Sequence, residues 1–257
     1  MNTDHAHDQE TEKLWQESEN LPFVKGLKEG KTVAEIMEQL DYQRAFKESP
    51  TELGCADGRC TEHRCGGAGA FILASEAEQA EFVRQNKGKI KVVKSHDGCG
   101  AAAIKFAQIN PADLPVGVTT SDQLGQYYCK KLAEKLGADY AHTSAREMSG
   151  SVHKERTIYF DGEGKFNPAA LPELPAGFMS SGSAVGMSDE YMQTELETLA
   201  KIALGEHGFG KRFTQENPLY IVVSAKDQQQ LKALTQIAEN AAKQFQGRLK
   251  VDGFIAK

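Results

Sequence analysis

The chain has 257 residues, of which 26% are charged, and a formal net charge of −6. Its acidic and basic residues are interspersed, which argues against a dedicated nucleic-acid-binding surface. No run approaches the roughly 18 apolar residues of a membrane span, and the polar start lacks the apolar core of a signal peptide. We therefore expect a cytoplasmic protein that binds neither nucleic acid nor membranes.

The cysteines indicate metal binding rather than a disulfide framework. There are five, and four of them lie between positions 55 and 99. Such clustering in a chain of this size fits a reducing compartment. The fifth, Cys129, lies at a helical position beside apolar residues and is expected to be a buried structural thiol.

The first 45 residues predict a helical N-terminal arm. Residues 1–20 are polar around a single Trp15, and both a short amphipathic helix and a partly disordered tail fit them. Thr32 followed by Glu35 forms a capping box at the start of a helix with one apolar face. Pro50 then ends the pattern before the first cysteine motif.

Thiols, an imidazole and a carboxylate gather in two motifs that predict a zinc site. Cys55 opens the run Cys-Ala-Asp-Gly-Arg-Cys, and His96 and Cys99 lie on the turn between a strand at 89–94 and an alanine-rich helix. Zinc favours thiolate and imidazole ligands, and a catalytic site keeps three protein ligands and leaves a fourth position for water. Cys55, His96 and Cys99 supply such a set.

Helices and strands alternate through the middle of the chain. We expect a helix between the two motifs, one after Cys99, and one over 121–136 that ends at Gly137. Residues 138–166 predict two extended runs joined by a hairpin at 148–151.

Two histidines lie in these extended runs. His142 and His153 could be ligands or proton shuttles only if they face the metal. In an extended run, a surface position or a hydrogen-bonded structural role is the more common outcome, and we expect that here.

The last third of the chain predicts an additional unit. The Gly/Ser-rich segment 177–188 is expected to be a loop, either a surface connection or a lid. A helix over 189–204, a strand LYIVVSA, a helix over 227–246 and a final strand then form a βαβ-like unit. The glycines of 205–210 follow a helix instead of preceding one, so we expect no nucleotide site.

Together these elements predict an α/β fold with a mixed, partly parallel sheet flanked by helices and an appended βαβ-like unit. We expect three parts: an N-terminal helical arm at 1–45, a zinc region at 46–166, and a carboxy-terminal extension at 167–257 packed on or beside it.

The two motifs resemble those of the β-class carbonic anhydrases, whose hallmark is Cys-x-Asp-x-Arg followed by His-x-x-Cys-Gly. The resemblance implies a β-carbonic-anhydrase-like fold in which Cys55, His96 and Cys99 bind Zn²⁺. It further implies that Asp57 and Arg59 form a catalytic dyad beside the metal.

The resemblance covers about residues 50–166, with weaker similarities at 63–69 and 152–166. Gly58 stands where the family usually has serine, and the two motifs lie closer together than is usual. The implied activity is reversible hydration of carbon dioxide to bicarbonate, with zinc hydroxide as the nucleophile, oriented by the Asp/Arg dyad. The implied assembly is a homodimer or larger.

Two alternatives remain open. Relatives of the β-class fold hydrolyse carbonyl sulfide or carbon disulfide by the same type of attack, and a narrow apolar entrance would favour those substrates. Alternatively, Cys55, Cys60, His63 and Cys65 form a closed structural zinc site in a non-catalytic binding protein, which leaves the second motif unexplained. The sequence also leaves open whether Asp57 closes the site by binding zinc itself.

Overall fold

A computed structural model describes residues 3–46, 51–57, 74–147, 153–206 and 208–256, with side chains from residue 9 onward. Its helices are α1 (Thr3–Glu19), α2 (Pro22–Lys28), α3 (Val33–Glu38), α5 (Glu76–Asn86), α6 (Gly100–Gln108), α7 (Ser121–Leu136), α8 (Asp189–Ala203) and α9 (Gln228–Ala242). Its strands are β1 (Glu52–Leu53), β2 (Val92–His96), β3 (Asp139–Thr143), β4 (Thr157–Asp161), β5 (Gly177–Ser180), β6 (Leu219–Ala225) and β7 (Leu249–Ile255).

The strands form two sheets, with orders β1-β2-β3 and β5-β4-β6-β7. Every pairing between the described strands is parallel, where the sequence suggested a mixed sheet. The expected α/β class, with parallel sheets flanked by helices, is confirmed. The antiparallel pairing found in the described ranges is an isolated bridge between Phe46 and Phe166.

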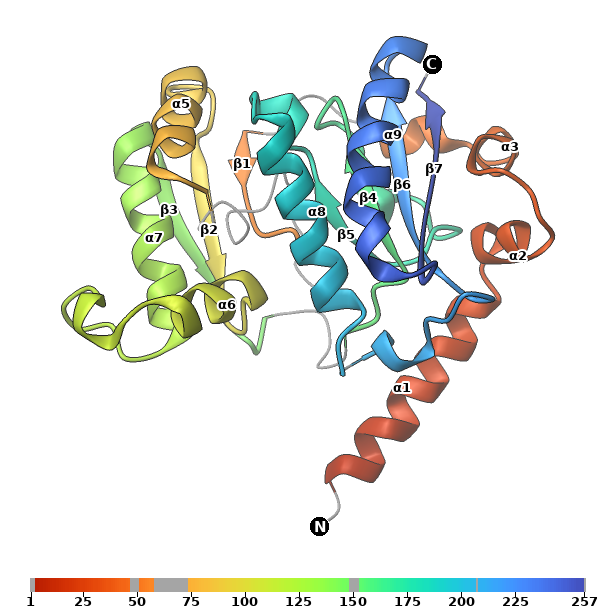
Figure 1. Cartoon of the computed structure of the whole chain (residues 1–257), viewed down its shortest axis with the longest axis horizontal. Coiled ribbons are helices and arrows are strands. Elements are labelled where there is room, and N and C mark those ends of the chain that lie inside the picture. Colours follow the sequence, from red (N-terminus) through yellow and green to blue (C-terminus); the bar gives the residue numbers. More distant parts are fainter. Residues whose placement is uncertain (1–2, 47–50, 58–73, 148–152, 207, 257) are drawn as a thin grey trace.

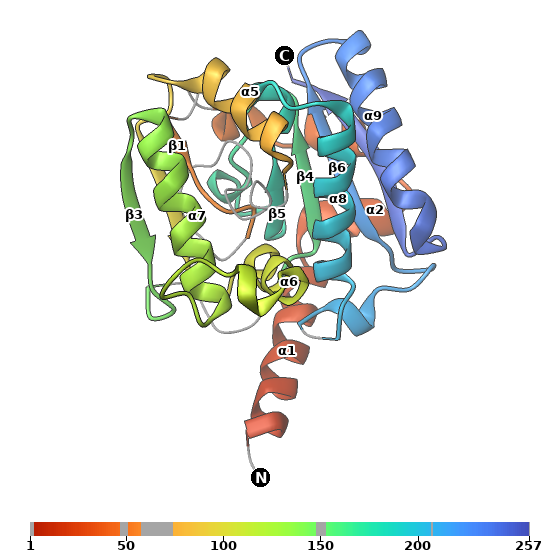
Figure 2. The same ribbon diagram turned by 60° about the vertical axis from the view of Figure 1, so that its left-hand side comes forward.

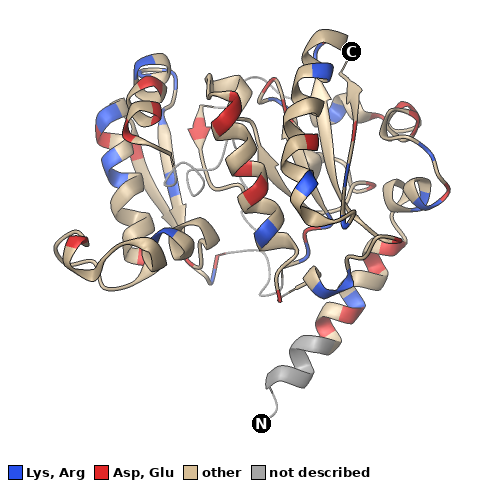
Figure 3. Cartoon of the chain, in the orientation of Figure 1, with Lys and Arg blue, Asp and Glu red and all other residues tan. Residues whose placement is uncertain are grey.

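Helices cover both sheets (Figures 1 and 2). α7 packs on β2 and β3 of the smaller sheet, and α9 packs on β6 and β7 with α8 beside it. α3 contacts β7, and α2 contacts α3. Figure 3 shows Lys and Arg interspersed with Asp and Glu along these helices. None of the helices in the described ranges combines the length and apolar character needed to cross a membrane.

The larger sheet is buried on both faces, as is usual when helices cover a parallel sheet. Successive side chains of a strand point to opposite faces. Ile158 and Phe160 therefore join one apolar cluster, with α8 and α9, while Tyr159 between them joins a second cluster with Phe23 of α2. All five residues of β4 are buried, which makes β4 the centre of the core.

The two sheets meet between β1 and β5. The backbone N–H of Met179 in β5 donates to the carbonyl oxygen of Ala56, just after β1, at 2.9 Å. On its other side, β5 pairs with β4, and Gly177 lies close to Thr157 of that strand. A Cβ at position 177 would lie only 2.5 Å from the side-chain oxygen of Thr157, so this close packing requires glycine. The chain around Cys55 therefore runs along the seam between the sheets.

Several local predictions are confirmed. Thr32 and Glu35 form the capping box of α3, and Gly137 ends α7 in the left-handed conformation with φ +68°. α9 connects the parallel strands β6 and β7 as a βαβ unit, and Cys129 is buried in α7. The unit is continuous with β4, because β6 pairs with β4 as well as with β7.

Besides the mixed sheet, two further predictions are wrong. The extended runs within 138–166 do not form a hairpin, because β3 pairs with β2 whereas β4 pairs with β5 and β6 in the other sheet. The Gly/Ser-rich segment is not all loop, because Gly177–Ser180 is the buried strand β5. β4 lies within the expected zinc region but pairs with strands of the carboxy-terminal part.

The N-terminal segment is helical, and Figure 1 shows α1 extending away from the rest of the molecule toward its N-terminus. Trp15 anchors the other end of the helix. Its ring packs edge-on against Phe209 and Phe213, and the guanidinium carbon of Arg156 lies 3.6 Å from its centroid. Arg156 also donates to Glu19 at 2.7 Å, so α1 is tied to the segment that enters β4.

Candidate metal centre

Three elements bring the predicted metal ligands together. Cys55 follows β1, His96 ends β2, and Cys99 is the residue at the N-cap of α6. Because β1 and β2 are neighbouring parallel strands, their carboxyl ends meet at one edge of the sheet. Gly98 adopts a positive φ of +67°, which lets the turn after β2 bring Cys99 back toward His96.

The ligand atoms have the spacing of a metal site. The two Sγ atoms of Cys55 and Cys99 lie 3.9 Å apart, and these atoms and a ring nitrogen of His96 all lie within 4.8 Å of one another. A tetrahedral zinc ion with Zn–S bonds of about 2.3 Å would hold two sulfurs about 3.8 Å apart. All three residues are buried.

The imidazole of His96 is held in an orientation that suits metal binding. Its Nδ1–H donates to the carbonyl oxygen of Asp97 at 2.8 Å, which leaves the Nε2 lone pair available. Nε2 is buried and makes no hydrogen bond with any described residue. A metal-bound histidine typically donates its other ring N–H in this way.

The charges of the three groups depend on one another. The hydrogen bond between the two thiols lowers the pKa of Cys55 and raises the pKa of Cys99. Burial disfavours the imidazolium form of His96, but the negative charges of Cys55 and Asp57 outweigh it and raise the pKa of His96 to about 9. The two thiols and the imidazole therefore titrate as one coupled set.

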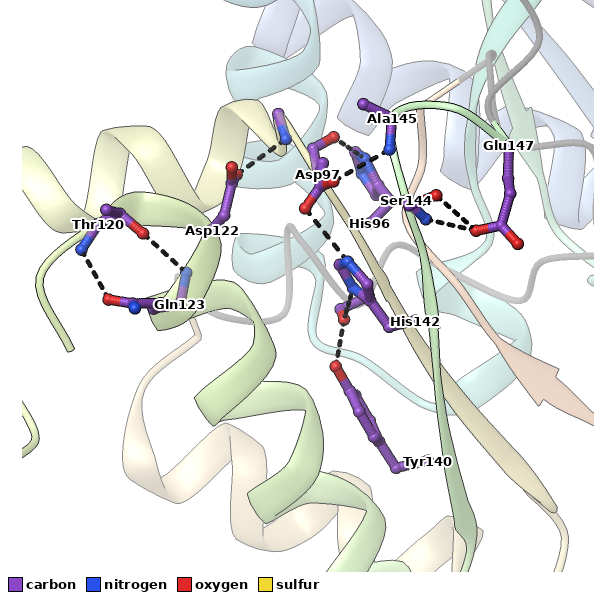
Figure 4. A network of polar contacts seen from close by, with 12 residues as sticks. His96, Asp97, Thr120, Asp122, Gln123, Tyr140, His142, Ser144, Ala145 and Glu147 are labelled. Carbon is purple, nitrogen blue, oxygen red and sulfur yellow. Dashed lines mark hydrogen bonds and ion pairs between the residues drawn. The ribbon is translucent and has the colours of Figure 1, made fainter. Parts of the chain in front are cut away.

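A polar network supports the turn that carries His96 and Cys99 (Figure 4). One carboxylate oxygen of Asp97 lies 3.1 Å from Nε2 of His142 on β3, and the other accepts from the backbone N–H of Ala145 at 3.0 Å. Nδ1 of His142 lies 2.8 Å from the hydroxyl of Ser95, which also contacts Tyr140 at 2.7 Å.

The same turn is held from α7. The carboxylate of Asp122 accepts from the backbone N–H of Gly98 at 2.8 Å. His142 therefore lies behind Cys55, His96 and Cys99, hydrogen-bonded to Ser95 and Asp97 in the role that the sequence favoured.

Asp57 is buried beside the three ligands, whereas Arg59 lies outside the described residues, as do Cys60, His63 and Cys65. The proposed dyad partner and the alternative closed zinc site are therefore not described. Asp57 and Cys55 line the same cavity, and the negative charge of Asp57 contributes to the raised pKa of His96.

A cavity of about 450 Å³ opens beside the ligands and is lined by Cys55 and Asp57. Most of its wall is apolar and comes from both halves of the chain. α6 contributes Ala101 and Ile104, β5 contributes Phe178, and α8 contributes Leu199 and Ile202. The part of the chain after residue 167 thus completes the cavity.

His153 also lines this cavity. Its Nδ1 lies 3.2 Å from a carboxylate oxygen of Glu155, which is the hydrogen-bonded role that the sequence favoured. One of its ring nitrogens groups with carboxylate oxygens of Asp57 and Glu155, all within 4.8 Å. The sequence analysis overlooked Glu155. The spacing His-x-Glu ahead of a strand was the available signal, because residues two apart in an extended chain share a face.

The donor set suits zinc. Two thiolates and an imidazole are ligands that zinc prefers, and three donors leave the fourth tetrahedral position open, as in catalytic sites. Among the described residues, the group contains these three ligands and no fourth. Comparisons of the chain with protein-family models, with curated proteins and with solved structures gave no match.

Proposed function

We propose that the protein is a zinc enzyme that reversibly hydrates carbon dioxide. The observation that carries the proposal is the buried Cys55, His96 and Cys99 group, with the unpartnered Nε2 of His96, beside a cavity that also contains Asp57. A zinc ion bound there would act as a Lewis acid that lowers the pKa of water, which supplies a nucleophile near neutral pH.

Asp57 would orient the nucleophile. Its carboxylate lies on the cavity wall two residues after Cys55, so it can accept a proton from an attacking water and fix the direction of the water's lone pair. By resemblance to the β-class enzymes, Arg59 would keep this carboxylate ionised and in place.

The apolar wall would hold the substrate. Carbon dioxide is small, linear and without net charge, so side chains such as Ala101, Ile104 and Leu199 can surround it without needing hydrogen bonds. Excluding bulk water from this wall also strengthens the electrostatic effect of Asp57 on the reacting groups.

The same wall favours a second candidate, hydrolysis of carbonyl sulfide or carbon disulfide. These molecules share the linear shape of carbon dioxide and its lack of net charge, so an apolar cavity accepts them too. The residues would have the same roles, and only the preferred substrate would differ.

One measurement tests the proposal. Zinc-loaded protein should hydrate carbon dioxide in a stopped-flow assay between about pH 7 and pH 9. Zinc-loaded protein that lacks this activity but hydrolyses carbonyl sulfide would move the assignment to the second candidate. Full zinc occupancy with neither activity would favour a zinc-stabilised binding protein.

A further inference from the structure

A second group of possible metal ligands lies beside the first and contains no cysteine. It consists of Asp57, His153 and Glu155. We propose that these three residues form a second divalent-cation site, whose oxygen and nitrogen donors accept Mn²⁺. The proposal does not depend on the identity of the reaction.

The spacing of the group fits a divalent ion. One potential ligand atom from each residue lies within 4.8 Å of the other two, and Nδ1 of His153 lies 3.2 Å from a carboxylate oxygen of Glu155. An octahedral ion with ligands at about 2.1 Å holds adjacent ligands about 3.0 Å apart and opposite ones about 4.2 Å apart.

Glu155 supplies an independent indication that a cation binds here. Its side chain is only 3% exposed, and its Oε1 makes no hydrogen bond with any described residue. Burying a carboxylate is costly unless its charge is paired and its oxygens accept hydrogen bonds or bind a metal. Oε2 of Glu155 contacts Nδ1 of His153, but Oε1 has no hydrogen-bond partner among the described residues.

The neighbouring arginine does not neutralise this charge. Arg156 points its guanidinium to the other side of the chain, where it donates to Glu19 and Asn217. Side chains along residues 153–156 thus alternate in direction. His153 and Glu155 point toward Asp57, and Arg156 points toward α1.

The chemistry of the donors separates the two sites. Two carboxylates and an imidazole offer oxygen and nitrogen, which suit Mn²⁺, whereas the site of Cys55 and Cys99 offers sulfur, which suits zinc. Asp57 and His153 both line the cavity, so an ion can reach them from it.

Mn²⁺ binding to the full-length, zinc-loaded protein tests the site. The EPR signal of free Mn²⁺ measures binding directly and does not require turnover, which matters because Asp57 also has a role in the proposed reaction. We expect one Mn²⁺ per chain. Glu155→Gln and His153→Ala should each weaken Mn²⁺ binding at least about tenfold while leaving zinc content unchanged.

Glu195→Gln is the matched control. Glu195 is an equally buried carboxylate, on α8, and accepts from the hydroxyl of Ser180 at 2.7 Å. Glu195 belongs to neither ligand group, so the Glu195→Gln variant should bind Mn²⁺ as tightly as the unaltered protein does. Circular dichroism and zinc content verify that each variant is folded.

Three results would overturn the second site. The first is that the unaltered protein binds no Mn²⁺ up to about 1 mM. The second is that Glu155→Gln and His153→Ala both bind Mn²⁺ as tightly as the unaltered protein. The third is that Glu195→Gln loses as much Mn²⁺ affinity as the two ligand variants. Since zinc content and hydration are measured separately, failure of this site would leave the proposed reaction untouched.

Discussion

The Sγ atoms of Cys55 and Cys99 lie 3.9 Å apart, although 44 positions separate the two residues in the chain. Two parallel strands and a tight turn create this proximity, which places the two sulfurs within reach of one metal ion. Replacing either thiol should therefore abolish tight metal binding.

We predict that Cys99→Ser weakens zinc binding by about 100-fold or more, because a hydroxyl is a poor substitute for a thiolate and leaves two ligands. Zinc content after gel filtration measures this. Cys129→Ser is the matched control, since Cys129 is equally buried but lies outside the ligand group. Zinc loss in Cys60→Ser and Cys65→Ser, with retention in Cys99→Ser, would instead establish the closed structural site.

Asp57→Ala should keep zinc and lower the rate of hydration by about 10²-fold or more, because a positioned proton acceptor typically contributes that much. Stopped-flow hydration and zinc content are measured on the same sample. A variant that retains the full rate would show that Asp57 does not orient the nucleophile, and a variant without zinc would indicate that Asp57 is itself a ligand.

Zinc affinity should rise steeply with pH. The pKa of His96 is raised to about 9, and the pKa of Cys99 is raised well above its ordinary value. At neutral pH, zinc must therefore displace one proton from His96 and one from Cys99. Two displaced protons increase the affinity about 100-fold per pH unit below pH 9. Competition with a chelator across this range measures the slope, and a slope of zero would contradict the protonation states assigned here.

In contrast to zinc affinity, the stability of the metal-free protein should fall as pH rises. The raised His96 pKa stabilises the fold fully below its ordinary value of 6.5, and this stabilisation is lost as pH rises through about 9. Chemical unfolding of chelator-treated protein across this range should show the decrease, and His96→Gln should remove it.

Trp15→Ala should lower the free energy of unfolding by about 3 kcal/mol, because it removes a buried aromatic side chain that packs against Phe209 and Phe213. The ring also covers the buried guanidinium of Arg156. Urea unfolding measures the loss, and Trp15→Phe should cost less. A loss below about 1 kcal/mol would show that α1 is not docked in solution.

The oligomeric state stays a prediction from resemblance, which implies a dimer or larger. Because Phe178, Leu199 and Ile202 wall the cavity from the same chain, we expect the rate per chain to stay constant on dilution. Light scattering and stopped flow at matched concentrations test this. A rate that falls as the assembly dissociates would show that a partner subunit completes the site.

Local chemistry in the sequence determined much of the secondary structure and indicated the candidate metal-binding group. The capping box of Thr32 and Glu35 defined the start of α3, and Gly137 defined the end of α7, because both depend on residues within one turn of helix. The group of Cys55, His96 and Cys99 was recognisable because thiols and imidazoles are common metal donors and a short turn joins two of the three residues.

Only the tertiary structure decided which strands pair and what surrounds the ligands. The sequence pattern of β5 predicts a loop, because the segment begins at Gly177. That same glycine permits close packing against Thr157 and Tyr159. The approach of His153 and Glu155 to Asp57 likewise depends on the seam between two sheets. Such contacts join segments about 100 residues apart, and no local pattern specifies them, because a strand's partner is chosen by packing across the whole core.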